Sequence, residues 1–246
     1  MLAELRKLLP DAPVIYAADL AGLPYGTKTE AEIAARVCGL LGRMSERFAP
    51  RAICIACNTA STIALAMTRD VLEVPIVGTV PAIKPAAAAT KTGTIGLLGT
   101  EATIRQPYVD RLEQDFAGDK TLLRHAAPGL VEAAEAKLRG EDVSLDEIAQ
   151  ECIGLTLQSG ARDIDTVVLA CTHFPLLLPE LVQVFGRDVQ FVHGAEGIAR
   201  RIAAVVEDRD FAANAPSRFV ATGDMARVEP LRACLAGYGL TDLATF

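Results

Sequence analysis

Short apolar runs alternate with amphipathic segments along nearly the whole chain. The apolar runs are rich in Val, Ile and Leu and end at Gly, Pro, Asp or Thr, a pattern that predicts buried strands. We place these strands at residues 14–19, 52–56, 74–78, 94–99, 122–124, 165–170, 189–192 and 218–224. Helical segments lie between them, at residues 2–9, 30–48, 60–67, 81–89, 130–138, 145–158, 176–185 and 195–206. This alternation predicts an α/β fold with mainly parallel sheets flanked by helices.

The segment 30–48 shows the helical periodicity most clearly. Its apolar side chains recur at helical spacing and form one stripe, which consists of Ile33, Val37, Leu40, Leu41, Met44 and Phe48. Thr27 or Thr29 can cap its first turn. The segment is therefore predicted to be an amphipathic helix.

One junction between a strand and a helix occurs twice in the chain. The dipeptide Ala-Cys ends the strand within residues 52–61 and again within residues 165–175, and polar residues follow the cysteine in both copies. Ligands bind at the carboxyl ends of parallel strands, and the N-terminus of a helix favours the thiolate form of cysteine. We therefore expect Cys57 and Cys171 to be reactive groups.

Two thiols on opposite sides of a cleft are suited to one kind of chemistry. One can remove a proton from one face of a carbon atom while the other returns a proton to the opposite face. That reaction is racemisation by two bases.

The duplicated junction divides the chain into two pseudo-symmetric domains. We assign residues 1–90 together with 195–246 to the first domain, which carries Cys57, and residues 91–194 to the second, which carries Cys171. The strand at 218–224 is expected to return to the sheet of the first domain. Because no low-complexity linker separates the halves, we expect them to pack closely, with the active site in the cleft between them.

Composition narrows the class of partner. The formal net charge is −7, from 24 basic and 31 acidic residues, and no basic block stands out. Nucleic-acid binding needs clustered Lys and Arg, so no nucleic-acid partner is expected. No apolar run reaches the ~20 residues of a membrane span, and residues 1–7 do not lead into the apolar core of a signal peptide. We therefore expect a cytoplasmic protein without a membrane partner.

The six cysteines do not indicate a disulfide framework in a chain of 246 residues. Cys54 and Cys57 have the C-x-x-C spacing of some metal sites. Side chains alternate along a strand, however, so positions three apart point to opposite faces. The two sulfurs are therefore not expected to meet at one metal ion, and neither a metal nor another cofactor is predicted.

The residues around the two cysteines resemble those of a known family. Ala-Cys-Asn-Thr-Ala at 56–60 and Ala-Cys-Thr-His-Phe-Pro-Leu-Leu at 170–177 are similar to the paired signatures of the glutamate racemases, in the aspartate/glutamate racemase superfamily. The resemblance runs from residue 2 to about residue 224. It implies cofactor-independent interconversion of L- and D-glutamate, with Cys57 and Cys171 as the acid and base. It also implies that D-glutamate is supplied to peptidoglycan synthesis and that the enzyme is a homodimer.

The resemblance implies roles for further residues near the cysteines. His173 is expected to assist the Cys171 thiol, and Glu132 matches a family glutamate near the same thiol. Asp19 either orients a substrate amine or only ends a strand. The positions that match substrate contacts, which are also good capping or turn residues, are Tyr25, Gly26, Asn58, Thr59, Thr100, Thr103, Thr172 and His173.

Two features depart from the family pattern. The family opens with a strand and an Asp-Ser-Gly-x-Gly-Gly loop, which supplies an acid/base assistant and a substrate-binding serine, whereas Met1 falls where the following helix is already under way. We expect the first sheet to lack a central strand, and the native gene product to begin upstream. His193-Gly194 stands where the family usually has Asp-Ser.

Two alternative functions stay open at this point. One is an aspartate racemase or another racemase of the superfamily. Aspartate racemases tend to carry Glu where His173 stands, which favours glutamate. The other is a truncated family member that binds a ligand without catalysis. The missing opening loop favours it, whereas the retention of both cysteines with Asn58, Thr59 and Thr172 argues against it.

Overall fold

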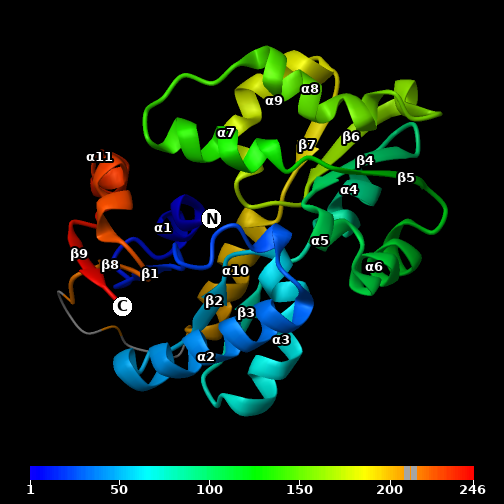
Figure 1. The fold of residues 1–246 in the computed structure, drawn as a ribbon. Coiled ribbons are helices and arrows are strands. Elements are labelled where there is room, and N and C mark those ends of the chain that lie inside the picture. The colour runs from blue at the N-terminus through cyan, green and yellow to red at the C-terminus, as the bar shows by residue number, and fades with distance from the viewer. Residues whose placement is uncertain (208–210, 212–214) are drawn as a thin grey trace.

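In the computed structural model the strands form three parallel sheets, which belong to two domains (Figure 1). The structure describes residues 1–207, 211 and 215–246. One sheet has four strands in the order β5-β4-β6-β7 and forms the upper domain of Figure 1. Its members are β4 (Thr94–Gly99), β5 (Thr121–Ala126), β6 (Ile164–Leu169) and β7 (Gln190–Val192). The expected α/β fold with parallel sheets is confirmed.

Both faces of the four-stranded sheet are buried under helices. Leu98 and Val167 face one apolar cluster, and the adjacent residues Leu97 and Val168 face another, because successive side chains of a strand point to opposite faces. Burial on both faces is typical of a parallel sheet. The helices of this domain are α4 (Ile83–Ala89), α5 (Glu101–Ile104), α6 (Pro107–Ala117), α7 (Gly129–Leu138), α8 (Leu145–Thr156) and α9 (Leu178–Phe185).

The strands of the other domain lie in two separate sheets. In one, β1 (Ile15–Ala18) pairs with β8 (Arg218–Ala221), which pairs with β9 (Asp242–Thr245). In the other, β2 (Ile53–Ile55) pairs with β3 (Ile76–Gly78). The predicted return of the 218–224 strand is confirmed. Within the described residues no ladder joins β1 to β2.

Helix α2 (Glu30–Phe48) follows the sequence prediction closely. Its cap is Thr29, whose hydroxyl accepts from the Glu32 amide at 3.3 Å while the Glu32 carboxylate accepts from the Thr29 amide at 2.8 Å. Three residues of the predicted stripe are buried, namely Ile33, Val37 and Leu41. The other helices of this domain are α1 (Leu2–Leu8), α3 (Asn58–Val71), α10 (Ala195–Val205) and α11 (Arg232–Gly237).

The domain division remains a proposal that sheet membership supports, with one departure: α4 lies within residues 1–90 but packs on the four-stranded sheet of the second domain. Every strand of the four-stranded sheet lies within residues 91–194, and every other described strand lies outside that range. Part of the range 195–246, namely residues 208–210 and 212–214, lies outside the described residues. The sequence prediction missed α11 and β9.

The carboxylate of Asp165 binds the segment 90–92, which leads into the four-stranded sheet. Asp165, on β6, accepts hydrogen bonds from the Thr90 hydroxyl at 2.6 Å and from the amides of Lys91 and Thr92 at 2.6 and 2.9 Å. Desolvation opposes its ionisation, but these bonds prevail and hold the pKa of Asp165 at about 2. The ionised carboxylate therefore fixes the chain where it crosses between the domains.

Replacing Asp165 with alanine should lower the free energy of unfolding. Hydrogen bonds to a charged group contribute ~1.5–3 kcal/mol each when protected from water, and partial exposure reduces this, so we expect a loss of about 1–2 kcal/mol near neutral pH. Because the pKa is depressed, the difference should shrink as the pH falls below 3.8 toward 2. Urea unfolding across this pH range measures it. Asp163→Ala, an exposed neighbour, is the control, and an equal loss in that variant would contradict the assignment.

Candidate active site

The two cysteine-bearing turns meet at the junction of the domains. Cys57 follows β2 and Cys171 follows β6, each just beyond the carboxyl end of its strand. The Thr172 hydroxyl donates a hydrogen bond to the Ala56 carbonyl at 3.0 Å. The residue after one cysteine therefore contacts the residue before the other. Both cysteines are free thiols, so this junction presents two sulfurs from different domains.

Cys57 is the N-cap residue of α3, and its environment favours the thiol. Burial raises the pKa of Cys57 to about 11, although the amides of Ala60 and Thr59 at the helix start act in the opposite direction. The charge of Cys171 raises the Cys57 pKa further. The amides at the helix N-terminus favour the Cys57 thiolate in direction, as expected, but desolvation outweighs them.

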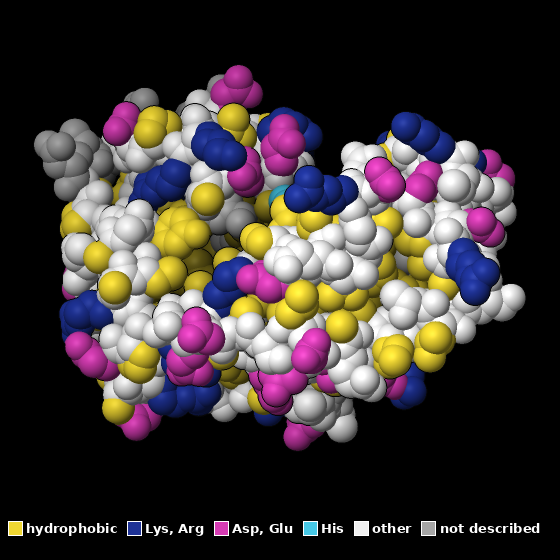
Figure 2. All heavy atoms as spheres, turned by 90° about the horizontal axis from the view of Figure 1, so that it is seen from above, with side chains coloured by type: hydrophobic (Ala, Val, Ile, Leu, Met, Phe, Trp, Pro, Cys, Tyr) yellow, Lys and Arg dark blue, Asp and Glu magenta, His cyan; other side chains and the backbone are white. Residues whose placement is uncertain are grey.

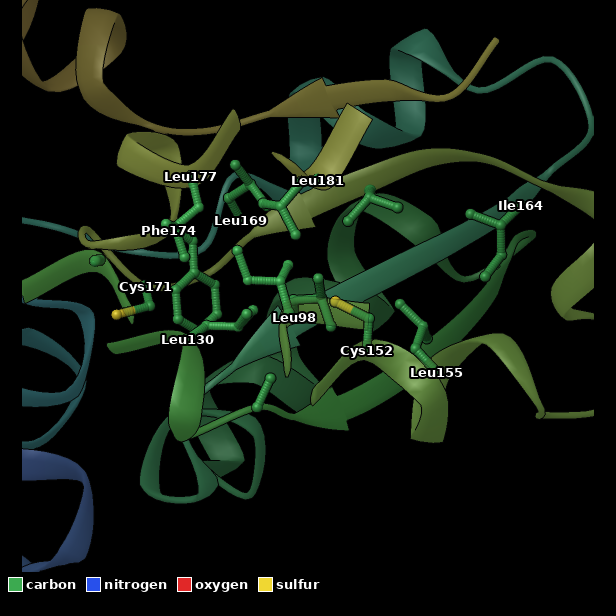
Figure 3. Close-up of a cluster of buried hydrophobic side chains, with 14 residues drawn as sticks. Leu98, Leu130, Cys152, Leu155, Ile164, Leu169, Cys171, Phe174, Leu177 and Leu181 are labelled. Atoms are coloured by element: carbon green, nitrogen blue, oxygen red, sulfur yellow. The ribbon is translucent and has the colours of Figure 1, made fainter. Parts of the chain in front are cut away.

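Cys171 lies at one end of the largest apolar cluster of the second domain. It is only 8% exposed, and its sulfur points out of the cluster, toward the side where the blue segments of the first domain lie (Figure 3). No α-helix begins directly after it. Phe174–Leu177 forms a 3₁₀ turn, in which side chains three apart align, so that Phe174 and Leu177 are both buried. The expected helix N-terminus beside Cys171 is therefore replaced by a turn.

His173 places a positive charge beside Cys171, where a helix N-terminus was expected. Its Nδ1 lies 3.8 Å from the Cys171 sulfur, and its Nε2 lies 2.8 Å from a carboxylate oxygen of Glu135. Burial lowers the pKa of His173, but the contacts with Cys171 and Glu135 outweigh it and raise the pKa to about 10. At neutral pH the ring is therefore an imidazolium beside the Cys171 sulfur.

The carboxylate at His173 is not the one that the sequence predicts. The side chain of Glu132 is exposed, and Glu135, three residues later on α7, makes the contact. Glu135 follows Val131 by one helical turn, and Val131 packs against the apolar cluster. The face of α7 that carries Val131 and Glu135 therefore points inward. This periodicity is visible in the sequence and is the signal that identifies Glu135.

Three threonine hydroxyls join the two domains beside Cys57. Thr59, from α3, lies 3.0 Å from the Thr100 hydroxyl and 2.9 Å from the Thr103 hydroxyl, and the last two, from α5, lie 3.0 Å apart. All three side chains are buried. A hydroxyl both donates and accepts and rotates freely. The three groups satisfy one another and can turn toward an anion.

Asn58 carries the one buried side-chain atom of the described residues that has no hydrogen-bond partner, its Oδ1. Asn58 is the first residue of α3 and is only 5% exposed. A buried acceptor without a donor is costly and uncommon in a native protein. This atom therefore marks a place for a donor beside Cys57.

Asp19 organises the loop that carries Tyr25 and Gly26. It accepts hydrogen bonds from both sides of the Arg36 guanidinium at 2.5 and 2.6 Å, from Tyr25 at 2.6 Å and from Thr222 at 2.5 Å. Although burial raises the pKa of Asp19, these donors prevail and lower it. Of the two roles left open for Asp19, the structure supports a structural one. The sequence gives no signal for its partners Arg36 and Thr222.

Gly26 brings this loop against the threonine cluster. A Cβ atom at Gly26 would lie 3.0 Å from the Cβ of Thr100. Burial and the bond to Asp19 raise the pKa of Tyr25, so its hydroxyl stays protonated and donates to the carboxylate. Tyr25 and Gly26 therefore border the same junction as the cysteines and threonines.

The remaining observations concern His193, metal-binding groups, membrane-spanning helices and surface charge. His193 accepts from the Ala195 amide at 3.4 Å at the start of α10. In the described part of the chain, no group of three His, Cys, Asp or Glu side chains is arranged to hold a metal ion. No helix there is long and apolar enough to span a membrane. Figure 2 shows basic and acidic side chains interspersed on one face, without a basic patch.

Replacing Gly22 with alanine should disturb the Asp19 cluster. A Cβ atom at this buried position would overlap Asp19 and approach Arg36 Nε to 2.5 Å and the Tyr25 ring to 2.8 Å. We expect a loss of about 1–3 kcal/mol in the free energy of unfolding, as for other overpacked sites. Urea unfolding tests this. Gly39→Ala, on α2 with open space around it, is the control and should gain ~0.5–1 kcal/mol. Unchanged stability in the Gly22 variant would contradict the prediction.

Comparison with known proteins confirms the resemblance. Residues 1–202 match the model of the Asp/Glu/Hydantoin racemase family. The chain is 58% identical over all its 246 residues to a glutamate racemase of Sphingopyxis alaskensis, of which it covers 92%. It is 44% identical over 207 residues to that of Salmonella typhimurium, covering 83% of this chain and 71% of the relative.

Solved structures show the same relationship. The structure of Escherichia coli glutamate racemase in complex with L-glutamate and the activator UDP-MurNAc-Ala superposes with a TM-score of 0.92 at 39% identity, over 99% of this chain and 91% of that one. The Thermus thermophilus enzyme in complex with β-chloro-D-alanine gives 0.75 at 29% identity, over 100% and 90% of the two chains. The chain therefore belongs to the Asp/Glu/Hydantoin racemase family.

Proposed function

We propose that this protein interconverts L- and D-glutamate, with Cys57 and Cys171 as two bases on opposite faces of the substrate Cα. The observation that carries the proposal is the hydrogen bond from Thr172 to Ala56, which holds the two cysteine-bearing turns together across the domain junction. A small substrate between the sulfurs then has one thiol on each face.

The charges around the two sulfurs give the starting protonation state. In the proposed cycle Cys171 acts first as the base, with the His173 ring 3.8 Å from its sulfur, and Cys57 acts as the thiol acid, because burial raises its pKa to about 11. The thiolate takes the Cα proton, and the electron pair left behind is delocalised into the α-carboxylate. The Cys57 thiol then delivers its proton to the opposite face of Cα. Afterwards Cys57 is the thiolate, and the same steps in reverse convert the other enantiomer.

Substrate binding uses the polar groups around the cleft. The α-carboxylate accepts hydrogen bonds from the hydroxyls of Thr59, Thr100 and Thr103, which turn away from one another to donate. The α-ammonium group donates to Asn58 Oδ1, the buried acceptor without a partner. Thr172 and the Tyr25–Gly26 loop border the same cleft.

The identity of the substrate rests on the relatives. The related proteins carry the name glutamate racemase, and the Escherichia coli relative was solved with L-glutamate. The D-glutamate product is assigned to peptidoglycan synthesis on the same ground. Turnover of aspartate, measured beside that of glutamate, decides between the two racemase functions.

We also propose a cytoplasmic homodimer that works without a cofactor. The family resemblance motivates the homodimer, and the acidic composition and net charge of −7 fit a protein without a nucleic-acid partner. The chemistry described above uses only thiols, hydroxyls and one imidazole.

Replacing either cysteine with serine should abolish racemisation. Serine is a far weaker acid than cysteine, so proton transfer on one face stops, and we expect the rate to fall by at least about 100-fold. Circular dichroism of the glutamate solution measures the rate. Each variant keeps one thiol, so Cys57→Ser and Cys171→Ser should each exchange the Cα proton of only one enantiomer with deuterium, and of opposite ones.

Cys38→Ser is the control for these variants. Cys38 lies on α2, away from the domain junction, and is also a half-buried free thiol. It should racemise glutamate at the rate of the unmodified protein. Wild-type turnover in either Cys57→Ser or Cys171→Ser would remove that cysteine from the mechanism.

Treatment with a chelator, or with hydroxylamine to remove pyridoxal phosphate, should leave the activity unchanged. The reason is that the two thiols and their neighbours account for every proton transfer in the proposed cycle. Racemisation before and after treatment and dialysis is the measurement. Loss of activity on chelation, restored by a divalent metal, would show that the proposed chemistry is incomplete.

A further inference from the structure

The turn that follows α5 is tied to the first domain by the side chain of Gln106. Its Nε2 donates a hydrogen bond at 2.7 Å to Oε1 of Glu30, the first residue of α2. Gln106 is only 7% exposed, and a hydrogen bond to a carboxylate is stronger than one between neutral groups. Among the described residues, the other side-chain hydrogen bonds between the assigned domains lie at the cysteine turns, in the threonine cluster or where the chain crosses at residues 90–92 and 193–195.

The main chain of Gln106 links its side chain to both neighbouring helices. Its amide donates to the Thr103 carbonyl at 3.2 Å, and its carbonyl accepts from the Val109 amide at 2.8 Å as the N-cap of α6. Helix α5 has only four residues, and a helix this short is not stable without tertiary contacts. A side chain that binds the first domain therefore also fixes the end of α5.

One segment of the first domain contacts both ends of α5. At the start of the helix, Thr100 lies against Gly26, where a Cβ atom would be 3.0 Å from the Thr100 Cβ. Beyond the end of the helix, Gln106 binds Glu30. Thr29 caps α2 directly before Glu30 and so fixes the turn in which this carboxylate lies. The position of α5 relative to the first domain is therefore set by residues 26–30.

We propose that Gln106 is a positioning residue for the carboxylate of the substrate: its bond to Glu30 keeps the two hydroxyls of α5 beside Thr59. The hydroxyls of Thr100 and Thr103 lie 3.0 and 2.9 Å from that of Thr59, which belongs to the other domain. This spacing requires that α5 be fixed relative to α3. The inference rests on the proposed function, in which the three hydroxyls bind the substrate carboxylate.

Loss of the Gln106 bond should weaken substrate binding without stopping proton transfer. The two cysteine turns are joined by the hydrogen bond from Thr172 to Ala56, which does not involve α5. The relation between the two thiols should therefore survive when α5 moves. The KM for glutamate should rise, and kcat should change little.

Three variants and one control test this role. Gln106→Ala removes the bond, and Gln106→Glu places a second carboxylate opposite Glu30, which should repel it. The double variant Gln106→Glu with Glu30→Gln exchanges the two groups and restores one donor and one acceptor. The control is Gln158→Ala, because Gln158 is also a partly buried glutamine of the second domain but donates within that domain, to the Gly154 carbonyl at 2.8 Å.

The kinetic result should separate KM from kcat. We expect the KM for glutamate to rise about 3- to 10-fold in Gln106→Ala, as for the loss of one hydrogen bond, and further in Gln106→Glu. The kcat of both variants should stay within about twofold. In the double variant and in Gln158→Ala, KM should lie within about twofold of that of the unmodified protein.

Hydrogen–deuterium exchange of the free protein provides a measurement that needs no activity. The amides of Thr103 and Ile104 both donate to the Thr100 carbonyl at 3.0 Å, so α5 should exchange slowly while it is held in place. Mass spectrometry of peptides that cover residues 100–106 should show exchange about 3- to 10-fold faster in Gln106→Ala. The double variant and Gln158→Ala should exchange at the rate of the unmodified protein.

Several results would overturn the proposal. Unchanged exchange in Gln106→Ala would show that the bond does not hold α5, and an equal rise of KM in Gln158→Ala would show that any loss of packing has the same effect. A fall in kcat with KM unchanged would contradict the role in binding. If the unmodified protein does not racemise glutamate, the proposed function fails, and the exchange measurements alone then decide whether Gln106 holds α5.

Discussion

The hydrogen bond between Thr172 and Ala56 fixes the geometry on which the whole site depends. It links two turns that belong to different sheets, each at the carboxyl end of a parallel strand. Strand position alone would place each cysteine at the edge of its own sheet, with no relation between the two. Because the bond joins residues directly adjacent to Cys57 and Cys171, any movement of one domain against the other changes the distance between the sulfurs. The threonine cluster of α3 and α5 adds a second connection at the same junction.

Burial and charge act differently on the two thiols, and their balance sets the chemistry. Around Cys57, desolvation outweighs the partial charges of the helix amides, and the thiol is favoured. Near Cys171 a full positive charge on His173 is present, which the Glu135 carboxylate supports from the other side. A full charge in a poorly solvated site outweighs a helix terminus, whose effect is typically ~0.3–1 kcal/mol. In the proposed mechanism the two halves therefore act as one acid and one base.

The sequence predicted the parts of the molecule that depend on local pattern. The strands β4 and β6, the helix α2 with its Thr29 cap, and both Ala-Cys junctions follow from periodicity and turn chemistry. The sequence-based prediction failed for local structure and side-chain partners that are determined by tertiary contacts. The turn after Cys171 is 3₁₀ because Phe174 and Leu177 must both be buried, and Glu135 replaces Glu132 because the inward face of α7 is set by its packing. The cluster of Asp19, Arg36 and Thr222 joins residues far apart in the chain, which no local pattern encodes.

The polar groups beside Cys57 differ in how a bound ligand would change their hydrogen bonding. The three threonine hydroxyls already satisfy one another, so a carboxylate that binds them replaces existing hydrogen bonds with stronger charge-assisted ones. Asn58 Oδ1 has no bond to lose. An unpaired buried acceptor costs ~1–3 kcal/mol, and a ligand ammonium group removes that cost entirely. An amino acid should therefore bind far better than the corresponding dicarboxylic acid without the amine, since only the amino acid pairs with Asn58 and also engages the threonines. In the proposed binding mode, discrimination for an α-amino acid thus lies in the first turn of α3, next to the thiol proposed as the acid.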